Sequence, residues 1–216
     1  SGFTGNLTIG NSITTVENSV FRGCNGFSGN LIIGNSVTTI GDHAFDGCNF
    51  TGSLTIPYSV TSIGDYAFED CNFTGSLIIP NSVTSMGENA FAYCSCFTGD
   101  LIIGNSITTI NGSTFSHCSG FTGNLTIGSS VNSIGILAFS GCSGFTSMNV
   151  FANNPPYNYL SFSDLNHGMP VYVPQGSVNA YQTSSYWSSF TNIQGMTLHE
   201  VTFVSTPVYG GTVTLN

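Results

Sequence analysis

The sequence predicts a solenoid built from short parallel strands, and three observations support this fold class. Phenylalanine returns every 23 or 24 residues, at Phe3, Phe27, Phe50, Phe73, Phe97, Phe121 and Phe145. Cysteine keeps the same step, at Cys24, Cys48, Cys71, Cys94, Cys118 and Cys142. The other apolar residues also recur at fixed places within each unit. Periods of this length are typical of solenoids, in which each repeat contributes one coil.

Residues 50–72 show the elements that each coil should contain. Residues 53–56 alternate between polar and apolar side chains, which predicts a short half-buried strand. Residues 57–58 turn the chain, and residues 60–63 form a second extended segment. Residues 65–68 predict a single helical or 3₁₀ turn. Each coil is therefore expected to place a strand on one side and short extended and 3₁₀ segments on the other.

Six units occupy residues 1–144 and should form one continuous core. A single unit of this length cannot bury its apolar face, but units stacked in register bury it against one another. Neighbouring strands in a parallel sheet lie about 4.8 Å apart, so six coils should span roughly 30 Å.

Residues 145–195 break the period and predict a seventh, degenerate repeat followed by a cap. A strand is expected near Met148, and another with Val171 and Val173 facing inward. Residues 177–181 predict the start of a short helix that continues towards Trp187. A solenoid end would otherwise expose its core, so we expect aromatic anchors here, namely Tyr181, Trp187 and Phe190.

Residues 196–216 show a third pattern, with two alternating segments around Gly210 and Gly211. This pattern predicts a β-hairpin over residues 200–215. We interpret it as the start of a further module, and the chain as a fragment of a longer protein.

The repeat unit resembles a known family of bacterial surface proteins. The segments Leu54–Cys71 and Leu77–Cys94 follow the pattern L-x-I-P-x-S-V-T-S-I-G-x-x-A-F-x-x-C, which is similar to the BspA-like leucine-rich repeats. The resemblance covers residues 3–193, including a closing segment at residues 169–193. It differs in placing Phe where the family more often has Leu. The resemblance implies a right-handed leucine-rich-repeat solenoid with a parallel sheet on one face, and a role in adhesion at the cell surface.

The charge pattern argues against several classes of partner. Charged residues make up only 5% of the chain, the formal net charge is −9, and Arg22 is the sole Lys or Arg. Such a chain has no electrostatic attraction for nucleic-acid phosphates or anionic lipid. No apolar run is long enough to span a membrane in this sequence.

The cysteine spacing favours a structural role over a metal site. Zinc sites use close pairs such as C-x₂-C, and the only close pair here is Cys94 and Cys96. One cysteine per coil should stack into a buried ladder of small hydrophobic side chains. Cys96 lies off this ladder and is the candidate for an accessible thiol. We expect no cofactor and no metal.

The acidic and histidine residues offer no catalytic arrangement. Equivalent positions in units two to four hold a row of acids, Asp42, Asp65 and Glu88. Calcium is one interpretation, but the series is broken at Asn18, Gly112 and Ile136, so we expect a solubilising stripe. His43 lies beside Asp42 and Asp46 on a turn, which favours a solvated cluster. The other histidines occur at unrelated repeat positions.

The outward side of the strands is the predicted binding surface. Two columns flank the buried leucines, one holding Asn30, Ser53, Ser76, Asp100 and Asn124, the other Ile32, Thr55, Ile78, Ile102 and Thr126. Three exposed isoleucines among polar neighbours would form an apolar stripe on a rigid face. A plain alternative is that β-branched residues simply favour strands.

These features predict a non-enzymatic binding or adhesion module at the cell surface or in a secreted protein. Its partner would be a protein or glycan of a host or a neighbouring cell. The alternative function is a structural spacer that presents another extracellular domain. An enzyme acting on polysaccharide is less favoured, because no pair of carboxylates suited to that chemistry can be identified.

Overall fold

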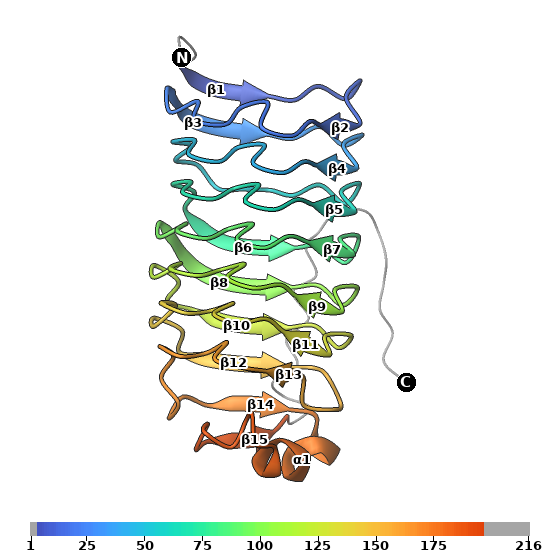
Figure 1. Cartoon of the computed structure of the whole chain (residues 1–216), viewed down its shortest axis with the longest axis vertical. Coiled ribbons are helices and arrows are strands. Elements are labelled where there is room, and N and C mark those ends of the chain that lie inside the picture. The colour runs from blue at the N-terminus through green and yellow to red at the C-terminus, as the bar shows by residue number, and fades with distance from the viewer. Residues whose placement is uncertain (1–3, 197–216) are drawn as a thin grey trace.

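The computed structural model describes residues 4–196, which form a stack of coils with strands along one side (Figure 1). These strands pair in parallel as a two-stranded and a six-stranded sheet. They are β1 (Gly5–Thr8), β3 (Phe27–Ile32), β6 (Gly75–Ile79), β8 (Phe97–Ile103), β10 (Asn124–Ile127), β12 (Ser147–Val150), β14 (Val171–Val173) and β15 (Ile193–Gly195). The predicted parallel-strand solenoid is confirmed. The hairpin expected over residues 200–215 lies outside the described residues.

A second row of short strands follows the first along each coil (Figure 1). It forms a four-stranded and a three-stranded parallel sheet, as the second extended segment predicts. The members are β2 (Thr15–Val16), β4 (Thr39–Ile40), β5 (Ser62–Ile63), β7 (Ser85–Met86), β9 (Thr109–Ile110), β11 (Ser133–Ile134) and β13 (Tyr157–Asn158).

The first row is interrupted at the third coil, where the strand predicted over residues 53–56 does not form. Both apolar side chains of this segment still face the core. In the fifth coil, Gly104 closes the strand by donating its N–H to the Ile79 carbonyl at 3.0 Å. Pro57 and Pro80 occupy the same position in the third and fourth coils and have no N–H. Residues 53–56 therefore lack the backbone hydrogen bond that closes the strand, both towards the second coil and towards the fourth.

Two columns of phenylalanine rings form the centre of the core. Rings in one column belong to the strand starts, and rings in the other to the turns on the far flank. Successive rings lie face to face with centroids 5.1 to 6.3 Å apart. The columns are Phe27, Phe50, Phe73, Phe97, Phe121 and Phe145, and Phe21, Phe45, Phe68, Phe91, Phe115, Phe139 and Phe162. Their mutual edge-to-face contacts, such as Phe68 with Phe73 at 6.1 Å, join the two sides of the coil.

The helical or 3₁₀ turn predicted over residues 65–68 is wrong. Tyr66 has a left-handed backbone with φ of 57°, and the equivalent residue of the neighbouring coils, such as His43 and Asn89, repeats this conformation. The N–H groups of Tyr66 and Phe68 donate to the carbonyls of Glu88 and Ala90 in the next coil, at 2.9 and 2.8 Å. A helix would satisfy these donors within its own coil, whereas the stack offers carbonyls from the following coil. Inter-coil bonding therefore determines the backbone of this flank.

The C-terminal cap follows the prediction in its strands and anchors but not in its helix length. After β14, the 3₁₀ turn η1 (Gln175–Ser177) leads into α1 (Val178–Thr183), which closes the end of the stack (Figure 1). The helix ends at Thr183, before Trp187, because Ser184 takes an extended backbone. None of the helices in the described part of the chain has the length and hydropathy of a membrane span.

The cap closes the core with three buried aromatic side chains, as predicted. Tyr181, Trp187 and Phe190 are buried, and the Trp187 ring lies 5.3 Å from Phe162 at the end of its column. The indole of Trp187 donates to the Pro156 carbonyl at 2.7 Å.

Polar groups on the turn flank are satisfied by Asp164, which accepts from the Ser140 hydroxyl and the Gly141 N–H at 2.7 and 2.9 Å. These two hydrogen bonds hold the pKa of the Asp164 carboxyl below its ordinary value.

The ring columns give a test of where the stability lies. Phe91 is fully buried and stacks on Phe68 and Phe115 at 5.1 and 5.5 Å, so Phe91→Ala should lower the free energy of unfolding by about 3 to 5 kcal/mol. Urea denaturation followed by circular dichroism measures the change. Tyr93→Ala, at an exposed position two residues away, is the control and should cost much less. Equal losses would mean that the ring column is not the main source of stability.

Candidate functional site

The predicted strand face exists, and its two columns differ in character. The column with Ile78, Ile102 and Thr126 lies in register across β6, β8 and β10. Its isoleucines are less exposed than predicted: Ile32 is 54% exposed, whereas Ile78 and Ile102 are half-buried. Neighbouring strands shield Ile78 and Ile102, so one isoleucine of the expected stripe is exposed and two are only partly exposed. Thr55 belongs to the interrupted third coil and is exposed.

The other predicted column is used by the fold itself. Asn30 donates its backbone N–H to the side-chain oxygen of Asn6 at 2.8 Å. The same contact joins Asp100 to the Ser76 hydroxyl at 3.0 Å, and Asn124 to the Asp100 carboxylate at 2.7 Å. These side chains therefore join successive coils, which limits their freedom to contact a ligand. Ser53, in the third coil, is exposed on the same face.

Glycine next to this column is required by the close approach of these side chains. A Cβ built on Gly123 would lie 2.1 Å from the Asp100 carboxylate oxygen, and one on Gly99 would lie 2.2 Å from the Ser76 hydroxyl. Both separations are shorter than any real contact. Gly99 and Gly123 thus make room for the side chain of the preceding coil.

The sequence reasoning missed the continuation of the face beyond the regular repeats. Asn149 of β12 pairs with Thr126, Tyr172 of β14 pairs with Asn149, and Gln194 of β15 pairs with Tyr172. The alternation of Val171, Tyr172 and Val173 could have revealed one of these positions. The outward row therefore runs from Ile78 to Gln194 across six paired strands.

The acidic row is a second ladder of the same kind. Asp65 donates its N–H to Asp42 Oδ1 at 2.9 Å, and Glu88 donates its N–H to Asp65 Oδ1 at 2.8 Å. Asn18, in the coil before Asp42, accepts a hydrogen bond from the Asp42 N–H through its side-chain oxygen, also at 2.9 Å. Within residues 4–196, no group of three or more His, Cys, Asp or Glu side chains is arranged to hold a metal ion. The row is thus more than a solubilising stripe, because it links consecutive coils.

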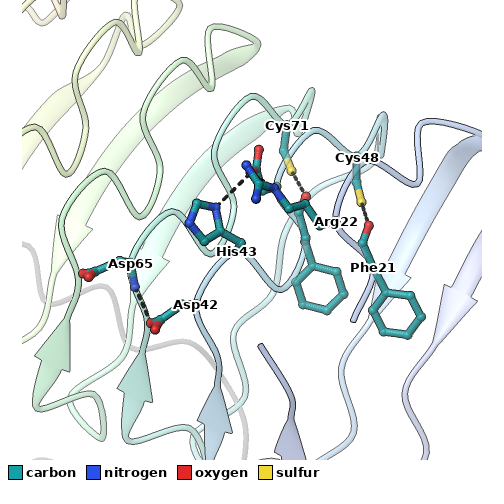
Figure 2. A network of polar contacts seen from close by, with 9 residues as sticks. Phe21, Arg22, Asp42, His43, Cys48, Asp65 and Cys71 are labelled. Carbon is teal, nitrogen blue, oxygen red and sulfur yellow. Dashed lines mark hydrogen bonds and ion pairs between the residues drawn. The ribbon is translucent and has the colours of Figure 1, made fainter. Parts of the chain in front are cut away.

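The acid–base cluster predicted around His43 lies on the turn flank, away from the strand face (Figure 2). His43 Nδ1 and Arg22 Nε both lie close to Asp46 Oδ2, at 2.9 and 2.8 Å. The His43 ring also stacks on Tyr66 with centroids 4.6 Å apart. Asp42 does not join this group, because its carboxylate accepts from the next coil. The arrangement is an ion-paired surface cluster that fixes the His43 ring.

The thiols form the predicted buried ladder and make a specific contact (Figure 2). Cys48, Cys71 and Cys94 donate to the carbonyls of Phe21, Phe45 and Phe68, at 3.1, 3.2 and 3.0 Å. Cys118 and Cys142 repeat this contact. Burial raises the pKa of Cys48 and of Cys94 to about 12. These thiols therefore stay protonated and unreactive near neutral pH.

Cys96 lies off the ladder, as predicted. Its side chain is half-buried, and its sulfur lies 3.5 Å from the Asn72 side-chain oxygen. Cys24 in the first coil is also half-buried.

Comparison with known proteins identifies the family. The sequence model of the family described as the BspA type leucine rich repeat region matches residues 3–122 and 94–212, in six copies. The chain belongs to the BspA-type leucine-rich repeat family. No curated protein matches it.

A solved structure of a leucine-rich repeat protein shares the fold. A leucine-rich repeat protein from Bacteroides ovatus ATCC 8483 matches with a TM-score of 0.53 and 21% identity, over 89% of this chain and 61% of that one. This chain therefore spans less than two thirds of that protein's length. The structure of a leucine rich cell surface protein from Faecalibacterium prausnitzii A2-165 has 17% identity and a TM-score of 0.29, over 88% of this chain and 79% of that one.

The acidic ladder can be tested by comparing two substitutions at one position. Asp65→Ala removes the acceptor for the Glu88 N–H and should lower the free energy of unfolding by about 1 kcal/mol. Asp65→Asn keeps the acceptor, as Asn18 does in the first coil, and should cost less. Urea denaturation measures both variants. If millimolar calcium raised the melting temperature of the native chain but not of Asp65→Asn, the row would be a metal site instead.

The raised thiol pKa values predict the pH dependence of stability. The unfolded chain ionises its thiols near pH 9, whereas folded Cys94 stays protonated up to about pH 12, so its contribution is complete below pH 9 and is lost as the pH rises. Between these values the loss is about 1.4 kcal/mol per pH unit for each such thiol. Cys94→Ala should be less stable at pH 7, and its deficit should shrink at pH 10. A deficit that stays constant across this range would show that the folded protein tolerates the thiolate.

Proposed function

We propose that this chain is a non-enzymatic binding module of a cell-surface or secreted protein. It contacts a protein or glycan of a host or a neighbouring cell through its strand face. The observation that carries the proposal is the in-register outward row of β6, β8, β10, β12, β14 and β15. Repeat proteins commonly bind through such regular surfaces.

The chemistry of the row suits a neutral or mixed macromolecular surface. Ile78, Ile102 and Tyr172 supply apolar contact area, and Thr126, Asn149 and Gln194 supply hydrogen-bonding groups between and beyond them. The row contains no charged side chain, and Asp100 in the adjacent column is already bonded to Asn124. Because aromatic and apolar residues dominate binding energy at interfaces, the isoleucines and Tyr172 are the expected anchors.

Family membership supports a surface role. Leucine-rich repeats of the BspA type generally serve as scaffolds for interaction. A location outside the cell also agrees with the small number of charged residues and the many Asn, Thr and Gly positions of this chain.

The proposal is tested by placing charge on the row. The double variant Ile78→Asp and Ile102→Asp should weaken retention on mucin-coated and basement-membrane-coated surfaces by roughly tenfold or more, because it removes the central apolar contacts. Retention is measured with purified, labelled chain. Polar residues are tolerated in this column, as Thr55 and Thr126 show, so the fold should survive.

Tyr93→Asp is the matched control. Tyr93 is exposed on the opposite flank, and Asp70 already occupies the equivalent left-handed position one coil earlier. The control should bind like the native chain. If the double variant binds as well as the native chain while keeping its melting temperature, the strand face is not the contact surface. A chain that is retained on neither surface would favour the alternative function, a spacer that presents another extracellular domain.

A further inference from the structure

A pocket lies on the turn flank, where the last coil meets the C-terminal cap. Its volume is about 220 Å³, and two segments far apart in sequence form its walls. One is the turn after β13, and the other follows the end of α1, which lies beside it at the base of the stack (Figure 1). The lining residues are Asn158, Tyr159, Leu160, Ser161, Phe162, Ser163, His167, Ser185, Tyr186 and Ser189. None of them belongs to the strand face.

Asn158 is the most unusual of these residues, because it interrupts a core column. It pairs in register with Ile134, which pairs with Ile110, and both isoleucines are buried. Asn158 is itself only 5% exposed. A buried amide is unfavourable unless it is hydrogen-bonded, and its nitrogen donates to the Tyr186 carbonyl at 3.3 Å. The Asn158 amide thus stands where the two preceding coils have isoleucine, and its hydrogen bond to Tyr186 joins the two walls of the pocket.

The rim of the pocket is aromatic and exposed. Tyr159 is 56% exposed and Tyr186 is 42% exposed, and Leu160 lies between the tyrosines in the lining. Tyr157 supports Tyr186 from outside by an edge-to-face contact at 4.7 Å. Four large side chains exposed within one short region form an apolar patch, and such patches mark contact sites.

The lining indicates the chemistry of the ligand. It contains no Asp, Glu, Lys or Arg, and it combines tyrosine rings with the exposed hydroxyls of Ser163, Ser185 and Ser189 and the imidazole of His167. Such a surface complements a ring with an apolar C–H face and hydroxyl groups at its edge. The volume is below the ~300–1,000 Å³ of pockets for drug-sized ligands, which suits a single small ring. The net charge of −9 disfavours anionic ligands.

We propose that this pocket binds a sugar ring of a neutral glycan. The ring stacks on Tyr159 and Tyr186, and its hydroxyls exchange hydrogen bonds with the exposed serine hydroxyls of the lining, those of Ser163, Ser185 and Ser189. This site is separate from the strand face and does not depend on binding there. The rest of the glycan chain can extend from the pocket into solvent, because both tyrosines of the rim are exposed.

The test uses the full chain of 216 residues on a printed glycan array. The array carries cello-, xylo- and manno-oligosaccharides and N-acetyllactosamine, together with sialylated and sulfated N-acetyllactosamine. At least one neutral glycan should bind, and the two acidic forms should bind more weakly than their neutral parent. Isothermal titration with the best neutral oligosaccharide then gives the affinity of the native chain and of each variant.

Tyr159→Ala and Tyr186→Ala should each weaken binding by about tenfold, because each removes one stacking ring. Tyr159→Phe and Tyr186→Phe keep the rings and should bind nearly as well as the native chain. Tyr58→Ala, at an exposed tyrosine in the third coil, is the matched control and should have no effect. The strand-face variant with Ile78→Asp and Ile102→Asp should also keep glycan binding, which separates this proposal from the strand-face function.

Three results would overturn the proposal. The first is that no neutral glycan on the array binds at millimolar concentration. The second is that both alanine variants bind like the native chain. The third is that the tyrosines are needed equally for native and enzymatically deglycosylated mucin, which would mean that the pocket takes a peptide. Melting temperatures equal to that of the native chain would confirm that the variants remain folded.

Discussion

The constant rise between coils is the constraint on which the rest of the structure depends. Backbone hydrogen bonds between parallel strands fix this rise near 4.8 Å, so every side chain sits almost above its equivalent in the next coil. Phenylalanine rings suit this spacing when slightly offset, and their centroids lie 5.1 to 6.3 Å apart. Acidic residues at equivalent positions, such as Asp42, Asp65 and Glu88, are accommodated because the carboxylates of Asp42 and Asp65 accept hydrogen bonds from the backbone of the next coil.

Polar side chains meet the same constraint by bonding to the neighbouring coil. Asp42, Asp65 and Asp100 direct a carboxylate oxygen to the next backbone N–H. The five buried thiols of the ladder each reach a carbonyl of the coil before them. The abundance of Asn, Thr and Gly has the same origin, since short side chains reach the next backbone and glycine makes room for them. Such residues on the surface support the fold first, and only the remaining side chains are available to a partner.

Two kinds of surface remain available, and they differ in scale. The outward row from Ile78 to Gln194 repeats the same geometry from strand to strand, so it suits an extended partner. The pocket at the cap exists because the period fails there. With an asparagine in a core column at position 158, and with the loop of Tyr186 folding back onto the last coil, the chain forms a concave site that no regular coil contains.

The sequence alone determined the period, the stacked columns of Phe and Cys, the two strands of most coils and the aromatic anchors of the cap, because periodic burial leaves a direct trace in residue order. It did not determine the left-handed turn at Tyr66 or the missing strand at residues 53–56, since both depend on hydrogen bonds with neighbouring coils. It likewise placed Asn30 and Asp100 on the outward face but not in a ladder. The pocket around Asn158 was decided by tertiary structure alone, because its walls lie about 25 residues apart in the chain and meet only when the cap folds against the last coil.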